Sequence, residues 1–154
     1  MVDKALHSSD SDEWYTPQEF FDKCSREVGW FDLDPCSDGT NAKCQNFFTK
    51  EDDGLLKEWS GKVFVNPPYS ENNFAYREIE WKRKKIYGWI EKCSKERERV
   101  EVIYLLIPSR TDTKVFHDFL YQKEWVELRF IKGRLKFGGA KNSAPSPSIT
   151  AISR

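Results

Sequence analysis

The amino-acid sequence predicts an α/β fold with a mostly parallel sheet and an antiparallel hairpin near its C-terminus. Short apolar segments alternate with amphipathic segments along the chain, and this alternation is typical of a parallel sheet covered by helices. Residues 100–107 (VEVIYLLI) are almost continuously apolar, as expected of a central strand buried on both faces. Residues 126–131 and 134–137 alternate in polarity on either side of Gly133, which predicts the hairpin.

The first helix is expected to begin within WYTPQEFF. Thr16 has the character of an N-cap, Pro17 takes the first helical position, and Glu19 completes a capping box. Apolar side chains then recur at helical spacing until Gly29, a residue type that commonly ends helices. The sequence therefore predicts one amphipathic helix between Pro17 and Gly29.

The later elements follow from similar patterns. A long charged helix is expected over residues 74–98, and a shorter one over residues 112–121 with Asp112 as its N-cap. His117 lies beside Phe116 at helical spacing, so we expect it to pack or cap rather than to catalyse. The remaining strands are expected at residues 31–33, 46–49, 63–65 and 148–153.

Composition narrows the class of protein. The chain has 154 residues, and its 25 Lys and Arg balance its 25 Asp and Glu, so overall charge argues neither for nor against a nucleic-acid partner. Its four cysteines include no C-x-x-C pair, which argues against zinc and a disulfide framework and favours reduced thiols. No apolar run suits a membrane helix, and the N-terminus lacks a signal-peptide pattern. We expect a cytoplasmic protein with a flexible segment 1–12 and a single domain 13–154.

The stretch VFVNPPYS at residues 63–70 has a chemical interpretation. Prolines offer backbone acceptors but no N–H, and the residue before a proline is held extended. The Asn66 side-chain oxygen and the Pro67 carbonyl can therefore accept two hydrogen bonds from one NH2 group, while Pro68 stiffens the segment and Tyr69 offers a stacking face. The alternative is a proline turn that only ends the strand.

The exocyclic amine of adenine has the shape that such a pocket would hold. Two acceptors would favour the change of its nitrogen toward tetrahedral geometry during methyl transfer. A sulfonium donor needs no metal, and a base in duplex DNA must first be flipped out. Two predicted strands end in polar residues, Asp34 and Asn66, and ligands of parallel sheets bind beyond these strand ends.

Several segments together resemble the phage-type N6-adenine DNA methyltransferases, the Dam family. The similar segments, which span most of the chain, are WYTPQEFF, FDLDPCSD, NAKC, FFTKEDDGL, WSGKVFVNPPYS, LLIPSRTDTKVFHDF, RFIKGRLKFG and NSAPSPS. The resemblance implies a small Rossmann-like methyltransferase fold, S-adenosylmethionine as the methyl donor and adenine in double-stranded DNA as the acceptor. It also implies a role in protecting phage DNA within restriction-modification.

The resemblance assigns roles to individual residues. Asn66, Pro67, Pro68 and Tyr69 match the catalytic motif. The positions that match donor-binding segments are Trp14, Tyr15, Thr16, Pro17, Asp34, Pro35 and Asp53. Asp34 is expected near the donor's amino group and Asp53 near its adenine. The usual glycine-rich loop is missing, so the ribose-binding residue is left between Asp38 and Asn41, and residues 71–88 are either target-recognition material or an extended helix.

Basic side chains supply candidate DNA contacts. The candidates are Arg110, Lys132, Arg134 and Lys136. A denser basic cluster over residues 77–85 fits a solvated helix face as well as a phosphate contact. Two other functions remain open: methylation of an NH2 group in RNA or in protein glutamine, and nucleic-acid binding without catalysis. The chain is expected to act as a monomer or a homodimer.

Overall fold

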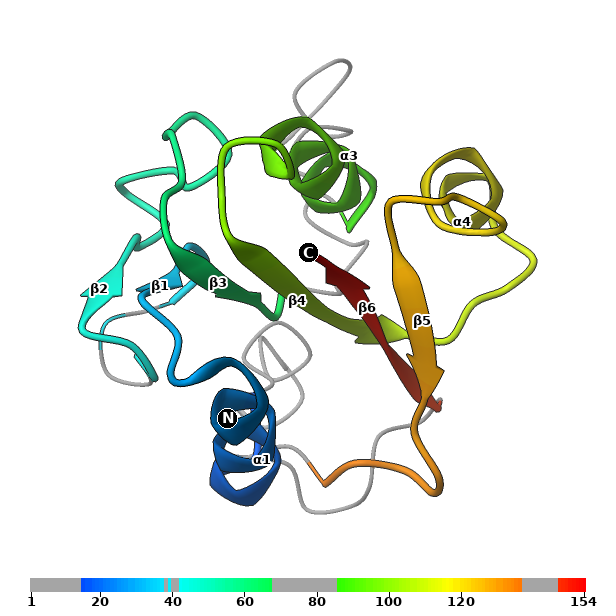
Figure 1. Cartoon of the computed structure of the whole chain (residues 1–154), viewed down its shortest axis with the longest axis horizontal. Coiled ribbons are helices and arrows are strands. Elements are labelled where there is room, and N and C mark those ends of the chain that lie inside the picture. Colours follow the sequence, from blue (N-terminus) through cyan, green and yellow to red (C-terminus); the bar gives the residue numbers. More distant parts are fainter. Residues whose placement is uncertain (1–14, 38, 40–41, 68–85, 137–146) are drawn as a thin grey trace, which may run out of the picture.

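A computed structural model describes residues 15–37, 39, 42–67, 86–136 and 147–154 (Figure 1). The helices and strands in these ranges are α1 (Gln18–Val28), β1 (Leu33–Asp34), β2 (Asn46–Phe47), β3 (Lys62–Val65), α3 (Ile86–Glu96), β4 (Val102–Pro108), α4 (Lys114–Phe119), β5 (Glu127–Phe130) and β6 (Ser148–Ser153). Within these ranges, no helix has the length and hydrophobicity that crossing a bilayer requires.

The strands form one mixed sheet in the order β2-β1-β3-β4-β6-β5. The first four of these strands are parallel, while β6 runs antiparallel to both β4 and β5. Figure 1 shows α1 on one face of the sheet and α3 and α4 on the other. This arrangement confirms the predicted α/β class with a mostly parallel sheet and antiparallel strands near the C-terminus.

The antiparallel pairing differs in detail from the expected hairpin. Residues 134–136 form no strand, and β5 pairs instead with β6, with Phe130 opposite Ile149. Every residue of β6 is buried, and a strand between two others suits such a buried, β-branched sequence. In the segment from Arg134 to Lys136, the two charged side chains lie in solvent. The alternating polarity of this segment therefore did not indicate a strand.

Strand β4 divides the core into two clusters, as expected of a strand covered on both faces. Ile103, Leu105 and Ile107 pack in the cluster that includes residues of α3 and α4. Tyr104 and its neighbours in alternate positions pack with Phe21 of α1. The second cluster is dominated by aromatic rings whose centroids lie 5.0–5.5 Å apart, a spacing that favours edge-to-face packing.

The helix ends confirm one expected cap and correct two others. Gly29 has φ of 76° in the left-handed region and ends α1 as predicted. The predicted capping box is wrong, because α1 begins after Pro17 without a side-chain cap and the Thr16 hydroxyl bonds elsewhere. In α4 the N-cap is Thr113 rather than Asp112, since the Thr113 hydroxyl accepts from the Phe116 N–H at 3.4 Å.

The two later helices, α3 and α4, end before the residues that the sequence suggested. Helix α4 ends at Phe119. Helix α3 begins at Ile86 and accounts for the described part of the predicted helix 74–98; residues 74–85 lie outside the described residues. Ile90 and Cys93 are buried on the inner face of α3, and this face packs against the sheet core.

Candidate active site

The carboxyl ends of β1, β3 and β4 meet at one edge of the sheet. Leu33 pairs in parallel with Val63, and Val65 pairs in parallel with Leu105. Asp34 and Asn66 therefore emerge from adjacent strands on the same edge, as predicted, and this edge is where ligands of parallel sheets bind.

Asn66 is fixed by a contact with the segment that precedes α1. Its side-chain nitrogen Nδ2 donates to the Thr16 hydroxyl oxygen at 3.0 Å, across 50 positions of sequence. Thr16 is 6% exposed and the neighbouring Pro67 is also buried, so the contact is shielded from solvent. The bond uses an N–H of the Asn66 amide, and the oxygen of the same amide is the end that can accept from an amine.

Cys36 connects Asn66 to the end of β1. The buried Asp34 carboxylate accepts from the Cys36 N–H at 3.1 Å and closes a turn after the strand. Burial, and then the Asp34 charge, raise the pKa of the Cys36 thiol well above its ordinary value, while a hydrogen bond with the Asn66 backbone acts in the opposite direction. The thiol is therefore uncharged at neutral pH and lies between the Asp34 turn and Asn66.

The loop that contains Asp53 packs against the same strand end. A Cβ atom on Gly54 would lie 2.1 Å from the Pro35 carbonyl oxygen, so only glycine allows this close approach of two backbones. Asp53 itself has φ of 56°, and its carboxylate accepts from the Leu55 N–H at 3.2 Å. The Asp53 carboxylate is thereby held within a tight loop beside Pro35.

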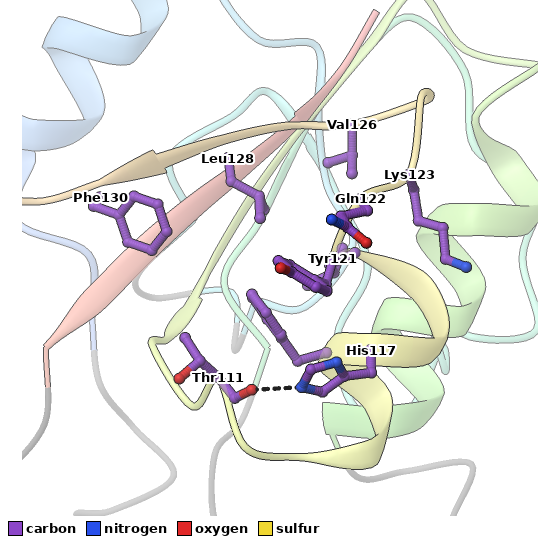
Figure 2. Close-up of a pocket in the computed structure, with 10 residues that line it drawn as sticks. Thr111, His117, Tyr121, Gln122, Lys123, Val126, Leu128 and Phe130 are labelled. Atoms are coloured by element: carbon purple, nitrogen blue, oxygen red, sulfur yellow. Dashed lines mark hydrogen bonds between the residues drawn. The ribbon is translucent and has the colours of Figure 1, made fainter.

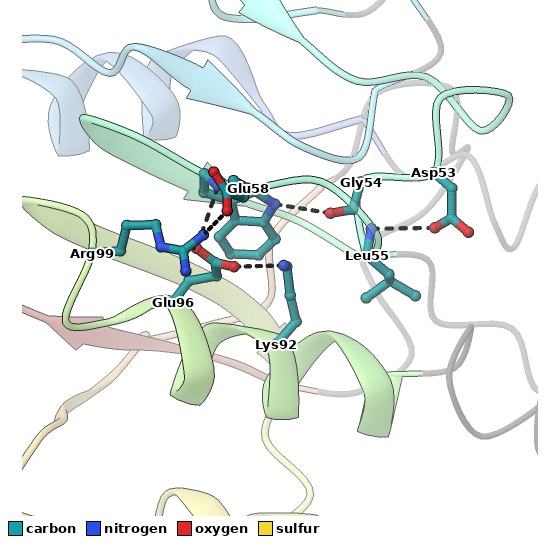
Figure 3. A network of polar contacts seen from close by, with 8 residues as sticks. Asp53, Gly54, Leu55, Glu58, Lys92, Glu96 and Arg99 are labelled. Atoms are coloured by element: carbon teal, nitrogen blue, oxygen red, sulfur yellow. Dashed lines mark hydrogen bonds and ion pairs between the residues drawn. The ribbon is translucent and has the colours of Figure 1, made fainter.

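A polar network on α3 holds this loop in place (Figure 3). The Trp59 indole donates to the Gly54 carbonyl at 2.9 Å, and the Trp59 N–H donates to the Glu96 carboxylate at 3.3 Å. Glu96, which is 5% exposed, pairs with Lys92 at 2.6 Å. The Lys92 ammonium lies 5.5 Å from the centre of the Trp59 ring, a cation–π distance.

Local sequence patterns assigned no role to Trp59 or Glu96. Trp59 was one of 6 tryptophans, and Glu96 lies in a segment rich in acidic and basic residues. Only the fold shows that Glu96 turns inward and accepts the Trp59 N–H. The inward position of the Glu96 carboxylate would have indicated its contact with Trp59. The burial of one residue cannot be predicted from a charged segment alone.

The structure thus brings together most of the predicted site segments. Each is joined to the next by a contact already described: Thr16 to Asn66, Asn66 through Cys36 to Asp34, and Pro35 to Gly54 beside Asp53. Tyr15 and Pro17 flank Thr16 and are partly buried. The predicted residues that lie outside the described ranges are Trp14, Asp38, Asn41, Pro68 and Tyr69.

The side chains of the predicted DNA contacts are exposed. Arg110 is exposed just beyond the carboxyl end of β4. Lys132, Arg134 and Lys136 are exposed in the segment after β5. Among the described residues, no group of three His, Cys, Asp or Glu side chains could hold a metal ion.

A mixed sheet with this topology, carrying Asn66-Pro67 at the carboxyl end of β3, defines the class as a Rossmann-like methyltransferase. Comparison with known proteins gives the family within this class. The chain belongs to the family described as DNA N-6-adenine-methyltransferase (Dam), which matches its residues 3–152.

Individual relatives are similar over shorter stretches. The "DNA N-6-adenine-methyltransferase" of Haemophilus phage HP1 (strain HP1c1) is 41% identical over 46% of this chain and 42% of its own length. The protein of the same name from Escherichia phage T1 is 29% identical over 68% of this chain and 39% of its own length. The "Putative methyltransferase YfdM" of Escherichia coli (strain K12) is 42% identical over 38% of this chain and 71% of its own length.

The chain therefore spans less than half the length of the two phage enzymes that it matches. No solved structure matches it.

Proposed function

We propose that this protein transfers a methyl group from S-adenosylmethionine to the N6 amine of adenine in double-stranded DNA. The observation that carries the proposal is the Asn66 amide, which is fixed by Thr16 at the sheet edge beside the buried Asp34. Membership of the Dam family and the names of its phage relatives support the same activity.

The chain's own groups would orient the acceptor amine. The Asn66 side-chain oxygen and the Pro67 carbonyl would accept the two N–H bonds of N6, and Tyr69 would stack on the flipped base. Both acceptors favour the positive charge that develops on N6 as it attacks the donor's methyl carbon. The N6–C bond forms, the S–C bond breaks with its electron pair going to sulfur, and N6 then loses a proton.

The residues beside Asn66 suit a donor that carries positive charges. S-adenosylmethionine supplies an activated methyl group on a sulfonium, and it also carries an ammonium group. Asp34 would accept from that ammonium, Asp53 would bind the adenine, and the segment from Trp14 to Pro17 would line the methionine part. The contacts that join Asp34, Pro35 and Gly54 support one continuous donor site.

The proposed substrate also accounts for the exposed cations. Arg110, Lys132, Arg134 and Lys136 would contact DNA phosphates, which fix the register of the protein on the duplex without reading its sequence. An enzyme that methylates DNA works where the DNA is, which supports a place in the cytoplasm of a bacterial host. Whether it acts as a monomer or a homodimer stays a prediction from the sequence.

The first experiment is nucleoside mass spectrometry of unmethylated duplex DNA incubated with the protein and S-adenosylmethionine. We expect N6-methyladenine with the wild-type protein and a loss of about 10²–10³-fold in rate for Asn66→Ala. Donor binding measured by calorimetry should be kept, because Asn66 acts on the amine.

The matched control is Asn46→Ala, which truncates an exposed asparagine of β2 and should keep full activity. An Asn66→Ala protein as active as the wild type would refute the assigned role. Donor binding without any modified base in DNA would refute adenine as the acceptor, and the same assay with RNA and glutamine-containing protein would then identify the acceptor.

A further inference from the structure

A concave site whose lining does not include Asn66 lies between α4 and β5. We call it the α4–β5 pocket, and its volume is about 540 Å³. Figure 2 shows side chains from α4, from β5 and from the segment between them facing one another around it. Its lining residues include Thr111, His117, Tyr121, Lys123, Leu128 and Phe130. A few polar groups around apolar and aromatic walls are typical of small-ligand sites.

The aromatic side chains of this pocket form a supported stacking surface. Phe130 is 68% exposed and Tyr121 is 45% exposed. Behind Tyr121, the ring of Phe116 stacks at a centroid distance of 5.8 Å and an interplanar angle of 24°. His117 packs edge-on against both Tyr121 and Phe116. Tyr121 is therefore an exposed flat ring held by packing, and with the exposed Phe130 beside it in the pocket it suits the face of a nucleobase.

The polar group beside these rings, His117, has a defined hydrogen-bond partner. His117 Nε2 lies 2.8 Å from the Thr111 carbonyl oxygen. Because a carbonyl can only accept, Nε2 carries the hydrogen, and a neutral ring then has Nδ1 as an acceptor. The side chains of Gln122 and Lys123 add donors at the pocket wall. Base edges offer complementary donors and acceptors.

Charge around the pocket favours an anionic partner. From Arg110 to Lys136 the chain has seven Lys or Arg and four Asp or Glu, a surplus of three positive charges in a chain of zero net charge. The exposed Lys132 and Lys136 lie in the segment that follows Phe130. A basic surface beside stacking aromatics is typical of contacts with a nucleic-acid strand.

The sheet register places the pocket relative to Asn66. Phe130 pairs with Ile149, which pairs with Ile107, while Val65 pairs with Leu105. Since β5 is antiparallel to β6 and β6 to β4, β5 runs parallel to β3 and Phe130 lies at the same edge as Asn66. The two are separated by three strand spacings, which is about 14 Å at about 4.8 Å per strand.

We propose that the α4–β5 pocket binds an unstacked nucleotide of the DNA substrate, about four nucleotides from the target adenine at about 3.4 Å per nucleotide. The proposal rests on the proposed function, because DNA is the acceptor there. Phe130 and Tyr121 stack on the base, and Lys123 and Lys132 contact its flanking phosphates. The pocket thus anchors the DNA strand while Asn66 holds the flipped base.

The first test is the Phe130→Ala variant, which removes a ring that is mostly in solvent and so leaves the fold intact. We expect the KM for duplex DNA to rise about tenfold, since stacking contributes about 1–3 kcal/mol per base. The kcat at saturating DNA and the Kd for the donor stay unchanged. Phe130→Tyr keeps the aromatic face and should keep the wild-type KM.

The control is Trp30→Ala, which removes an equally exposed ring, 64% in solvent, just after α1. Helix α1 covers the opposite face of the sheet from α4 (Figure 1), so this variant should keep the KM for DNA. A Phe130→Ala protein with the wild-type KM overturns the proposal. An equal rise in the KM for Trp30→Ala also overturns it, because the effect would then come from the loss of any exposed aromatic ring.

The second test locates the contact on the DNA. Once the methylated adenine is mapped in an oligonucleotide, single abasic sites are placed at each of the neighbouring positions in turn. We expect the wild-type protein to bind more weakly to DNA with an abasic site about four nucleotides from the target than to intact DNA. The Phe130→Ala variant should bind these two DNAs equally. Equal losses in both proteins overturn the assignment. A wild-type dimer that Phe130→Ala converts to monomer, in sedimentation, overturns it too, because the pocket would then bind a second copy.

The proposed function and this inference fail separately. A wild-type protein that methylates no DNA contradicts the function. Fluorescence anisotropy with a labelled duplex then decides the pocket alone: weaker binding by Phe130→Ala supports it, and equal binding by both proteins overturns it.

Discussion

Replacing Trp59 by phenylalanine tests whether α3 holds the loop that carries Asp53. The change removes the indole N–H that donates to the Gly54 carbonyl at 2.9 Å and keeps an aromatic ring. Gly54 is buried and its carbonyl keeps a longer bond from the Lys57 N–H at 3.4 Å, so the loss of the indole donor costs about 1–3 kcal/mol. Trp59 is 1% exposed, so the smaller ring leaves a partial cavity that costs about 1 kcal/mol more.

Together these losses lower the free energy of unfolding by about 2–4 kcal/mol. For a domain of this size, each kcal/mol shifts the Tm by about 2–4 °C, so the Tm should fall by roughly 5–15 °C. The measurement is thermal unfolding followed by circular dichroism. Trp30→Phe makes the same substitution at a side chain that is 64% exposed, and should change stability by less than about 0.5 kcal/mol.

Calorimetry at a temperature where Trp59→Phe is folded then measures donor binding. Because Gly54 packs against Pro35 beside Asp34, a loosened loop should raise the Kd for the donor. A Tm equal to that of the wild type would refute the assigned role of the Trp59 network in stability. A lowered Tm with an unchanged donor Kd would show that the network supports the fold and not the donor site.

Two further predictions concern other contacts. Gly54→Ala places a Cβ 2.1 Å from the Pro35 carbonyl oxygen, so the free energy of unfolding, measured with denaturant, should fall by more than about 3 kcal/mol. The control Gly133→Ala should lower it by about 1 kcal/mol, because Gly133 has φ of 74° but no atom lies within 4 Å of the added Cβ. Hydrogen bonds from Tyr104 and then Arg129 lower the pKa of Glu27 below its ordinary 4.5, so its contribution to stability is present above that pH and is lost as pH falls through the lowered pKa. Glu27→Gln should thus lower the free energy of unfolding by about 1 kcal/mol or less near pH 7, since the side chain is partly exposed. In unfolding curves the difference from the wild type should shrink below about pH 4. A difference that is constant with pH would contradict this role of Glu27.

Local patterns predicted the elements that depend on local physics. The apolar run around β4, the proline stop after Asn66 and the left-handed Gly29 all lie as expected. The shared edge of Asp34 and Asn66 followed from parallel strands alone. These features depend on hydrophobic periodicity and on backbone restrictions, both of which are written in short segments.

The errors come from competition by distant residues. The segment around Thr16 satisfies a capping-box pattern, but the Asn66 amide, 50 positions away, takes the hydroxyl. Residues 134–136 alternate like a strand, yet the partner that β5 accepts is β6. The inward position of Glu96 depends on Trp59, which lies 37 positions earlier. No local window contains both partners in any of these cases.

The place of β6 in the sheet has a consequence for folding. Its two neighbours, β4 and β5, are both synthesised before it, and within the described sheet they do not pair with each other. Until residues 148–153 arrive, the apolar edge of β4 is left without its antiparallel partner, and such open edges favour aggregation. Closing the sheet also requires contacts as distant in sequence as Ile103 with Ser153, which slows folding through loop-closure entropy. The nascent chain therefore exposes an open sheet edge until residues 148–153 have been synthesised.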